Sequence, residues 1–396
     1  MTVYLDYNAT TPVDPAVFDA MAPFFTSNFG NAGSIHTAGQ CARAAVDAAR
    51  DSVAALLGAK PSEIVFTSGG TEADNLAILG IVVRMDLSPA YEGPRRHVIT
   101  SAIEHHAVFN TCEELQESGV DVTFVRVGPS GVIDPEDVRR ALREETVLIS
   151  IMHANNELGT LQPIEEIGKI AKEAGVVFHC DAVQSAGKVP IDVNRLGVDL
   201  LSISAHKIYG PKGTGVLYVR SGTSIEPLFY GGHAERDRRP GTENVPGIVG
   251  MGKAAELART QLEADATRIG SLRDHLERAL LEKVPAVRVN GDPARRVPNT
   301  TNLTFPSAGG EALVIALDLQ GVECSTGAAC SSGAVEPSHV LTAIGLSDDD
   351  ARSTLRISLG RPTTSAEIDE AIRVIPDVVA RLRAISPRAS AEVPAH

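Results

Sequence analysis

The chain of 396 residues is 43% hydrophobic and 22% charged, and its 36 basic and 50 acidic residues give a formal net charge of −14 at pH 7. This composition is typical of a globular protein and excludes wholesale disorder. The length predicts two or three domains of about 150 residues. The acidic balance argues against direct nucleic-acid binding and against an anionic membrane surface, while a local pocket for one phosphorylated ligand is compatible with it.

Neither a membrane span nor a secretory signal is predicted. The longest apolar run covers residues 76–83 and is interrupted by Gly80, far short of the ~20 residues of a membrane helix. The N-terminus has no basic stretch followed by an apolar core, so we expect a cytoplasmic protein. The cysteines form no CxxC pair, which disfavours a disulfide framework or a four-ligand zinc site.

Short apolar runs alternate with amphipathic stretches in the first two thirds of the chain. Helices are predicted over 38–57, with Gly58 as the stop, and over 165–174, with Gly175 as the stop. The alternation predicts an α/β fold with a mostly parallel central sheet and helices on both faces. The predicted strands begin at Ile64, His97, Asp121, Thr146, Val176, Leu200 and Gly215.

From about Met251 the pattern changes to a long amphipathic helix over 252–282, followed by the strand-like segments VRVNG, TNLTF and TLRISL and by helices near Gly310 and Ser365. This predicts a smaller α+β domain. We expect an N-terminal segment at 1–15 that packs with the small domain, a large domain at 16–255, a small domain at 256–385 and a flexible tail at 386–396.

Polar residues cluster where the predicted strands end. Ligands of open α/β sheets bind outside the carboxyl ends of the strands, so these clusters predict one site. The clusters are 69–72, 104–106, 155–157, 181–184 and 205–207.

The glycine turn at 68–71 precedes an apolar helix that contains Leu76, Ala77 and Leu79, and it could accept an anion at the helix N-terminus. Thr71 with Asp74 resembles a capping box, so an ordinary capped helix is the alternative, and Glu72 and Asp74 must point away if phosphate binds here. GPKGTG at 210–215 lacks the spacing of a nucleotide loop and precedes a strand, which favours a plain turn.

Asp181 follows one apolar strand, and Lys207 lies at the end of the next. A buried carboxylate needs a cation or hydrogen bonds, and a simple Asp181–Lys207 salt bridge would satisfy it. The alternative is a pyridoxal phosphate site, in which a lysine forms the Schiff base and an acid keeps the ring nitrogen protonated. The spacing leaves both open. A metal site at His105–His106 or at 179–181 is disfavoured, because neighbours on a strand face opposite ways.

Two further residues have alternative interpretations. Alternation along TLRISL puts Arg356 and Ser358 on the face opposite the core, so Arg356 is either an exposed edge residue or a clamp for a substrate carboxylate. Cys330 lies in the small-residue loop STGAACSSG, where a thiol is accessible and either inert or reactive. Cys324 is expected to be structural. The other three cysteines are expected in the core: Cys41, Cys112 and Cys180.

The chain carries a series of distinctive segments. In chain order they are YLDYNATTP, FTSGGTEADN, EHHAV, MHANNELG, HCDAVQSAGK, SISAHKIYGPKGTG, RRPGTENV, STGAACSSG and LRISLGR. Taken together, these segments resemble the cysteine desulfurases of the IscS/NifS type, which are fold-type I enzymes of the class V aminotransferase superfamily. The resemblance runs from about residue 3 to about 380, and its motifs stand in the same order.

The resemblance implies a pyridoxal 5'-phosphate enzyme that takes sulfur from L-cysteine and leaves L-alanine. Lys207 looks like the Schiff-base lysine, Asp181 like the ring-nitrogen partner and Gln184 like the ligand of the ring hydroxyl. His105 looks like the ring-stacking and acid–base histidine. The implied phosphate ligands are Gly70, Thr71, Ser204 and His206, with Thr242 contributed across a homodimer.

For the substrate, the resemblance implies that Asn156, which also contacts the cofactor, and Arg356 bind the carboxylate, and that Cys330 forms a persulfide. The sulfur would pass to acceptors, either an iron–sulfur scaffold or tRNA-thiolation proteins, and no metal is implied. Selenocysteine lyase or transamination is the alternative within the superfamily. A metal- or nucleotide-binding regulatory protein is the alternative from another class.

Overall fold

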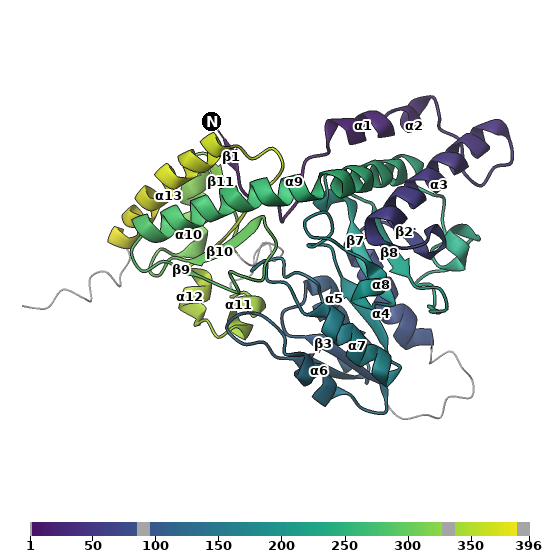
Figure 1. Ribbon diagram of the computed structural model, residues 1–396, viewed down its shortest axis with the longest axis horizontal. Coiled ribbons are helices and arrows are strands. Elements are labelled where there is room, and N and C mark those ends of the chain that lie inside the picture. The colour runs from purple at the N-terminus through teal and green to yellow at the C-terminus, as the bar shows by residue number, and fades with distance from the viewer. Residues whose placement is uncertain (1, 85–95, 327–336, 386–396) are drawn as a thin grey trace, which may run out of the picture.

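The computed structural model describes residues 2–84, 96–326 and 337–385, and the chain forms a larger and a smaller region joined by one long helix (Figure 1). The larger region is built on a seven-stranded sheet of order β2-β8-β7-β6-β5-β3-β4. β8 is antiparallel to both of its neighbours, and the other adjacent strands are parallel. The predicted α/β class with a mostly parallel sheet is confirmed. The strands are β2 (Ile64–Thr67), β3 (His97–Ser101), β4 (Asp121–Val125), β5 (Thr146–Ser150), β6 (Val177–Asp181), β7 (Leu200–Ser204) and β8 (Gly215–Val219).

Successive residues of the central strands face two hydrophobic cores. Ile99 and Ile149 pack on the face that is covered by α3 (Thr37–Leu57), α7 (Ile164–Ala174) and the start of α9 (Val245–Lys283). Val98 and Leu148 pack against α4 (Gly70–Arg84) and α5 (His106–Glu117). Because side chains alternate along a strand, covering both faces makes the whole strand apolar. The helices of this region are α1 (Pro15–Met21), α2 (Pro23–Thr26), α3 (Thr37–Leu57), α4 (Gly70–Arg84), α5 (His106–Glu117), α6 (Pro135–Ala141), α7 (Ile164–Ala174) and α8 (Val193–Leu196).

Two predicted helix ends are confirmed. α3 stops at Gly58 (φ +66°) and α7 at Gly175 (φ +67°), and both glycines take the left-handed conformation that ends a helix at little cost. The GPKGTG segment is a turn that leads into β8, as predicted.

The smaller region contains a three-stranded antiparallel sheet of order β12-β10-β9 and a parallel pair of β1 with β11. Its strands are β1 (Val3–Tyr4), β9 (Arg288–Val289), β10 (Thr300–Thr304), β11 (Val322–Glu323) and β12 (Thr354–Ser358). Its helices are α10 (Gly310–Asp318), α11 (His339–Ala343), α12 (Asp348–Arg352) and α13 (Ser365–Ile385). The first part of α9 (Val245–Lys283) packs in the core of the larger region, for example through Met251. Its last part packs in the core of the smaller region, for example through Leu276.

The N-terminal segment contacts both regions. Leu5 packs in the core of the smaller region, and the Thr11 N–H donates to the carbonyl of His206 at 3.0 Å in the larger one. The predicted boundary between residues 255 and 256 lies inside α9. The division into domains stays a prediction, and the predicted tail at 386–396 lies outside the described residues.

One prediction about the core is wrong. Cys41 is exposed, because it lies on the outward side of α3, whereas Cys112 and Cys180 are buried as expected. None of the helices formed by the described residues has both the length and the apolar character that crossing a bilayer requires.

Candidate active site

Asp181 and Lys207 lie at the same edge of the large sheet. β6 ends at Asp181, which is in register with Ser202 of the parallel neighbour β7, and Lys207 closes the short turn that follows β7. Asp181 is buried, and one carboxylate oxygen accepts the N–H of Val183 at 2.8 Å. Lys207 Nζ donates to the carbonyl of Asn8 at 2.5 Å and to that of Ala9 at 2.8 Å. The lysine amine therefore lies between β7 and the N-terminal segment.

Burial raises the pKa of Asp181 to about 6, against the lowering effects of the Val183 N–H and of the Lys207 charge. Two more carboxylates lie in the same buried region. Burial raises the pKa of Glu104 to about 8, and burial together with the Asp181 charge raises that of Asp74. Near neutral pH, Glu104 is protonated while Asp181 can ionise. This arrangement was not predicted, although Glu104 and Asp74 lie within the motifs EHHAV and FTSGGTEADN.

The turn before α4 packs closely on the ends of β6 and β7. A Cβ atom added at Gly70 would lie 2.9 Å from Val183 Cγ2 and 3.6 Å from Ser204 Cβ, so only glycine fits there without displacing a neighbour. Residues 70 and 204, both expected to bind phosphate, are thus brought together. His206 follows β7, with its Nδ1 3.1 Å from Thr10 Oγ1.

The predicted capping box of Thr71 and Asp74 is wrong. Glu72 is the residue that accepts the Ser68 N–H, at 2.8 Å, and it also pairs with Arg239 at 2.9 Å. Asp74 is instead buried beside His179, 3.6 Å from its Nε2. Asp74 points away from the turn, whereas Glu72 occupies the Ser68 N–H, so an anion at the N-terminus of α4 would bind the other N–H groups of the turn.

His105 caps the N-terminus of α5, where its Nδ1 accepts the N–H of Ala107 at 3.1 Å. Burial lowers its pKa to about 4, and the nearby charges of Lys207, His106, His339 and Arg356 add to this effect. The ring is therefore neutral at pH 7. Because Nδ1 is an acceptor, the proton is on Nε2, which can donate a hydrogen bond. The proposed acid–base role of this histidine stays a prediction.

The amide of Gln184 is held from both sides. Its Nε2 donates to the carbonyl of Asn8 at 3.0 Å, and its Oε1 accepts from Lys188 Nζ at 2.6 Å. Burial and the charges of Lys207 and Arg356 lower the pKa of Lys188 well below its usual value. The sequence analysis missed Lys188, although its spacing of four residues from Gln184 was a signal.

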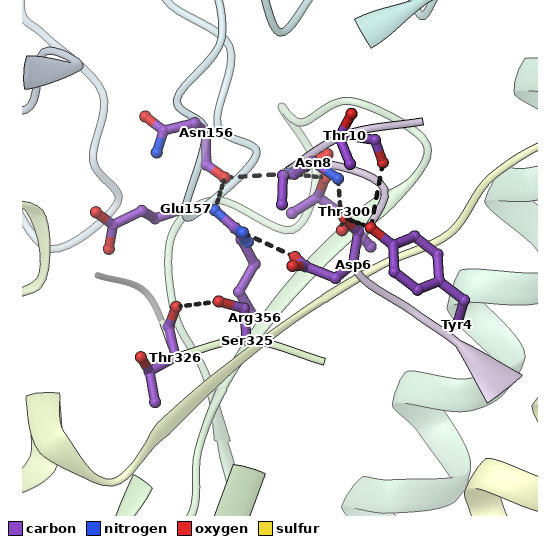
Figure 2. Close-up of polar contacts among 12 residues, drawn as sticks. Tyr4, Asp6, Asn8, Thr10, Asn156, Glu157, Thr300, Ser325, Thr326 and Arg356 are labelled. Carbon is purple, nitrogen blue, oxygen red and sulfur yellow. Dashed lines mark hydrogen bonds and ion pairs between the residues drawn. The ribbon is translucent and has the colours of Figure 1, made fainter. Parts of the chain in front are cut away.

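Asn8 connects the two regions of the site. Its side-chain Nδ2 donates to the carbonyl of Asn156 at 3.1 Å and to Thr300 Oγ1 at 2.9 Å (Figure 2). Its backbone N–H donates to Ser358 Oγ at 2.9 Å. Its carbonyl accepts from Lys207 and Gln184, so Asn8 contacts the sheet of the smaller region and the turns that follow β6 and β7 in the larger one. The motif YLDYNATTP contributed to the resemblance, but no role for Asn8 was predicted.

Arg356 is buried, so the interpretation of an exposed edge residue is wrong. The N-terminal segment and the turn at 155–157 cover its side of β12, and its guanidinium contacts Asp6 and the carbonyl of Asn156 (Figure 2). Among the described residues, neither Arg356 Nε nor Asn156 Oδ1 has a hydrogen-bond partner, and both atoms are buried. Two unmet polar atoms at the predicted carboxylate site fit a polar ligand.

Two predicted site residues are not part of this cluster. Thr242 is exposed and lines a separate surface cavity of about 660 Å³, together with Arg43 and Arg50. Cys330 lies outside the described residues. The described ends of its segment contact the carboxylate site, because the Arg356 N–H donates to the Ser325 carbonyl at 2.7 Å and Ser338 Oγ donates to Glu157 at 2.6 Å.

The donor set fits pyridoxal phosphate. An amine and an acid stand at neighbouring strand ends, and a glycine turn opens a helix. Arg356 Nε and Asn156 Oδ1 are buried and have no hydrogen-bond partner in the described part of the chain. Within the described ranges, no group of three or more His, Cys, Asp or Glu side chains is arranged to hold a metal ion. The His179 ring instead lies between Ser150 Oγ at 2.8 Å and Ser202 Oγ at 3.0 Å.

A family model described as aminotransferase class-V matches residues 3–371. The chain is 48% identical to cysteine desulfurase IscS of Dictyoglomus turgidum, covering 97% of this chain and 96% of that protein. It is 50% identical to cysteine desulfurase IscS of Methanosarcina thermophila, covering 97% and 94%.

Among solved structures, a NifS-like protein superposes with a TM-score of 0.89 at 37% identity, covering 96% of this chain and all of the other. A structure titled SspA in complex with cysteine has a TM-score of 0.80 at 41% identity, covering 90% and 99%. Fold and site thus define an enzyme of the class V aminotransferase type. Within that class, the chain belongs to the cysteine desulfurases.

Proposed function

We propose that this chain uses pyridoxal 5'-phosphate to transfer the sulfur of L-cysteine to Cys330, leaving L-alanine. The observation that carries the proposal is the placement of Lys207 and Asp181 at adjacent strand ends, with the charge of one acting on the pKa of the other. The alternatives of selenocysteine lyase and transamination are not favoured, because the near relatives reported above are named cysteine desulfurases.

The cofactor, when bound, supplies an electron sink that makes the C–S bond of cysteine labile. Lys207 would hold it and then move a proton at the substrate α-carbon. Ionised Asp181 would face the ring nitrogen of the cofactor, and Gln184 would face the ring oxygen. The phosphate would be bound by the Gly70–Thr71 turn together with Ser204 and His206. His105 would donate a hydrogen bond through Nε2. Asn156 and Arg356 would bind the substrate carboxylate.

The sulfur transfer balances without an external oxidant. The Cys330 thiolate attacks the sulfur of L-cysteine, an S–S bond forms and the C–S bond breaks. The carbon that loses sulfur gains a proton, so L-cysteine and the Cys330 thiol become L-alanine and a persulfide. An acceptor thiol then takes the terminal sulfur. The acceptor class is an iron–sulfur scaffold or a tRNA-thiolation protein.

We further propose a homodimer in which Thr242 reaches the phosphate of the partner's cofactor. The support is the exposure of apolar side chains on one N-terminal stretch, with Phe29 at 75% and Ile35 at 92% exposure. Such a run is costly in water and is typical of an association surface. Size-exclusion chromatography with light scattering tests this, and a monomer at micromolar concentration would contradict it. We also propose a cytoplasmic location for the chain.

The central experiment compares Cys330→Ala with Cys41→Ala, since Cys41 is an exposed thiol outside the site. L-alanine is measured by chromatography and the protein persulfide by mass spectrometry. We expect Cys41→Ala to behave as wild type and Cys330→Ala to lose both products by about a hundredfold or more. If Cys330→Ala forms both products at the wild-type rate, the proposed function is wrong.

A further inference from the structure

Asp6 and Arg356 form an ion pair at the junction of the N-terminal segment and β12. Asp6 Oδ1 accepts from Arg356 Nη2 at 2.8 Å, and the side chains are 18% and 2% exposed (Figure 2). The motif YLDYNATTP contributed to the resemblance, but no role was predicted for Asp6.

The backbone around Asp6 is fixed by strand pairing. The Leu5 N–H donates to the Glu323 carbonyl at 2.7 Å, and the Ser358 N–H donates to the Leu5 carbonyl at 2.8 Å. Asp6 itself bridges to Ser358, two residues from Arg356 on the same side of β12. The hydrogen bonds of this segment with β11 and β12 therefore fix the backbone from which the Asp6 carboxylate extends.

Two contacts set the plane of the Arg356 guanidinium. Nη2 bonds Asp6, and Nη1 donates to the carbonyl of Asn156 at 3.2 Å. Because the guanidinium is rigid and planar, these two bonds also fix the direction of Nε–H. Nε is buried without a partner in the described part of the chain, as is the nearby Asn156 Oδ1. The ion pair thus leaves one fixed, unused donor at the predicted carboxylate site.

We propose that Asp6 is a positioning residue for substrate binding: by pairing with Arg356 it holds the guanidinium in the orientation that receives the carboxylate of L-cysteine. The inference rests on the proposed function. Asp6 acts through Arg356 and does not touch the substrate.

The Asp6 charge also repels a carboxylate, which opposes this effect. Orientation outweighs repulsion here, because a buried guanidinium without a counter-ion is costly and turns toward other acceptors. Lys207 also keeps the surroundings cationic, since its charge and that of Arg356 lower the pKa values of His105 and Lys188. The sign of the change in KM therefore distinguishes a positioning residue from a competitor.

The test uses holoenzyme variants Asp6→Ala and Asp6→Asn. Asparagine keeps an acceptor for Nη2 and removes the charge. We expect KM for L-cysteine to rise about tenfold in Asp6→Ala and about threefold in Asp6→Asn, with kcat within about twofold. The inhibition constant of cysteamine, which is cysteine without the carboxylate, should not change, and the cofactor absorbance should match wild type.

The matched control is Asp265→Asn. Asp265 pairs with Arg361 at 2.7 Å and is 21% exposed, so it is a comparable ion pair away from Arg356. We expect its KM to stay within about twofold of wild type. If Asp6→Ala does not fold, Asp6→Asn decides by the same measurements.

An unchanged or lowered KM in the Asp6 variants overturns the proposal, as does an equal loss of cysteine and cysteamine binding. Absence of turnover in wild type refutes the proposed function instead, so the two failures are distinguishable.

Discussion

The candidate site has two halves that the chain builds differently. The half on the large sheet consists of residues that follow strands directly, such as Asp181 after β6 and Lys207 after β7. The other half, with Asn8, Asp6 and Arg356, is made by contacts between residues about 350 positions apart. Strand order alone aligns the first half, whereas the second exists only after the N-terminal segment pairs with β11 and β12. The first half should therefore carry the chemistry, and the second should tune substrate binding.

The largest effect is expected from Lys207→Ala. The amine has no replacement at this strand end, so alanine formation should fall by about 10³-fold or more. Loss of the visible absorbance of the bound cofactor, recorded on the same sample, checks the cause. Lys212→Ala is the control, since Lys212 is exposed in the turn before β8. If Lys207→Ala retained activity, the half of the site on the large sheet would not be the half that carries the chemistry.

A smaller effect is expected from Arg356→Lys, which tests the second half. Lysine keeps the charge, but its single nitrogen cannot reproduce the planar guanidinium, which bonds Asp6 and the Asn156 carbonyl through two separate nitrogens and directs Nε–H elsewhere. We expect kcat/KM for L-cysteine to fall by about 10- to 100-fold, mainly through KM. A fall in kcat alone would show that this half takes part in the chemistry.

Lys188→Met tests a residue that the sequence analysis missed. Methionine has similar length but cannot donate to Gln184 Oε1, so the amide loses one of its two bonds. Titration of the apoprotein with pyridoxal phosphate should give affinity about three- to tenfold weaker. Lys169→Met, on the exposed side of α7, should bind as wild type. Equal affinity in both variants would show that Gln184 needs no second contact.

The smallest effect concerns the buried acids and is thermodynamic. Folding raises the pKa of Glu104 from 4.5 to about 8, so the native state binds a proton that the unfolded state releases. Stability from this group is full below pH 4.5 and falls, by up to about 1.4 kcal/mol per pH unit, as pH rises toward 8. Glu104→Gln mimics the protonated acid. The free energy of unfolding, measured with urea, should therefore depend less on pH between pH 5 and 8 in this variant than in wild type. Parallel pH profiles would contradict the assignment.

The pattern of strands and helices was predictable because covered strands are apolar throughout and helices end at glycine. Gly58, Gly175 and the seven strands of the large sheet are where they were predicted. The Thr71–Asp74 capping box was wrong, because a short motif does not show which acid turns back to the N-terminus of the helix. Cys41 was placed in the core on helical spacing, but that spacing does not tell which side of α3 faces water.

The sequence by itself determined the α/β class, the strand-end residues Asp181 and Lys207 and the family, since these depend on local periodicity and on motifs contiguous in the chain. Only the tertiary structure decided that Arg356 is buried and paired with Asp6, that Asn8 contacts both regions, and that Lys188 holds Gln184. Those contacts join segments that are far apart in the chain. Whether a residue is buried depends on which of these segments covers it. Alternation along β12 specifies only the side on which Arg356 lies.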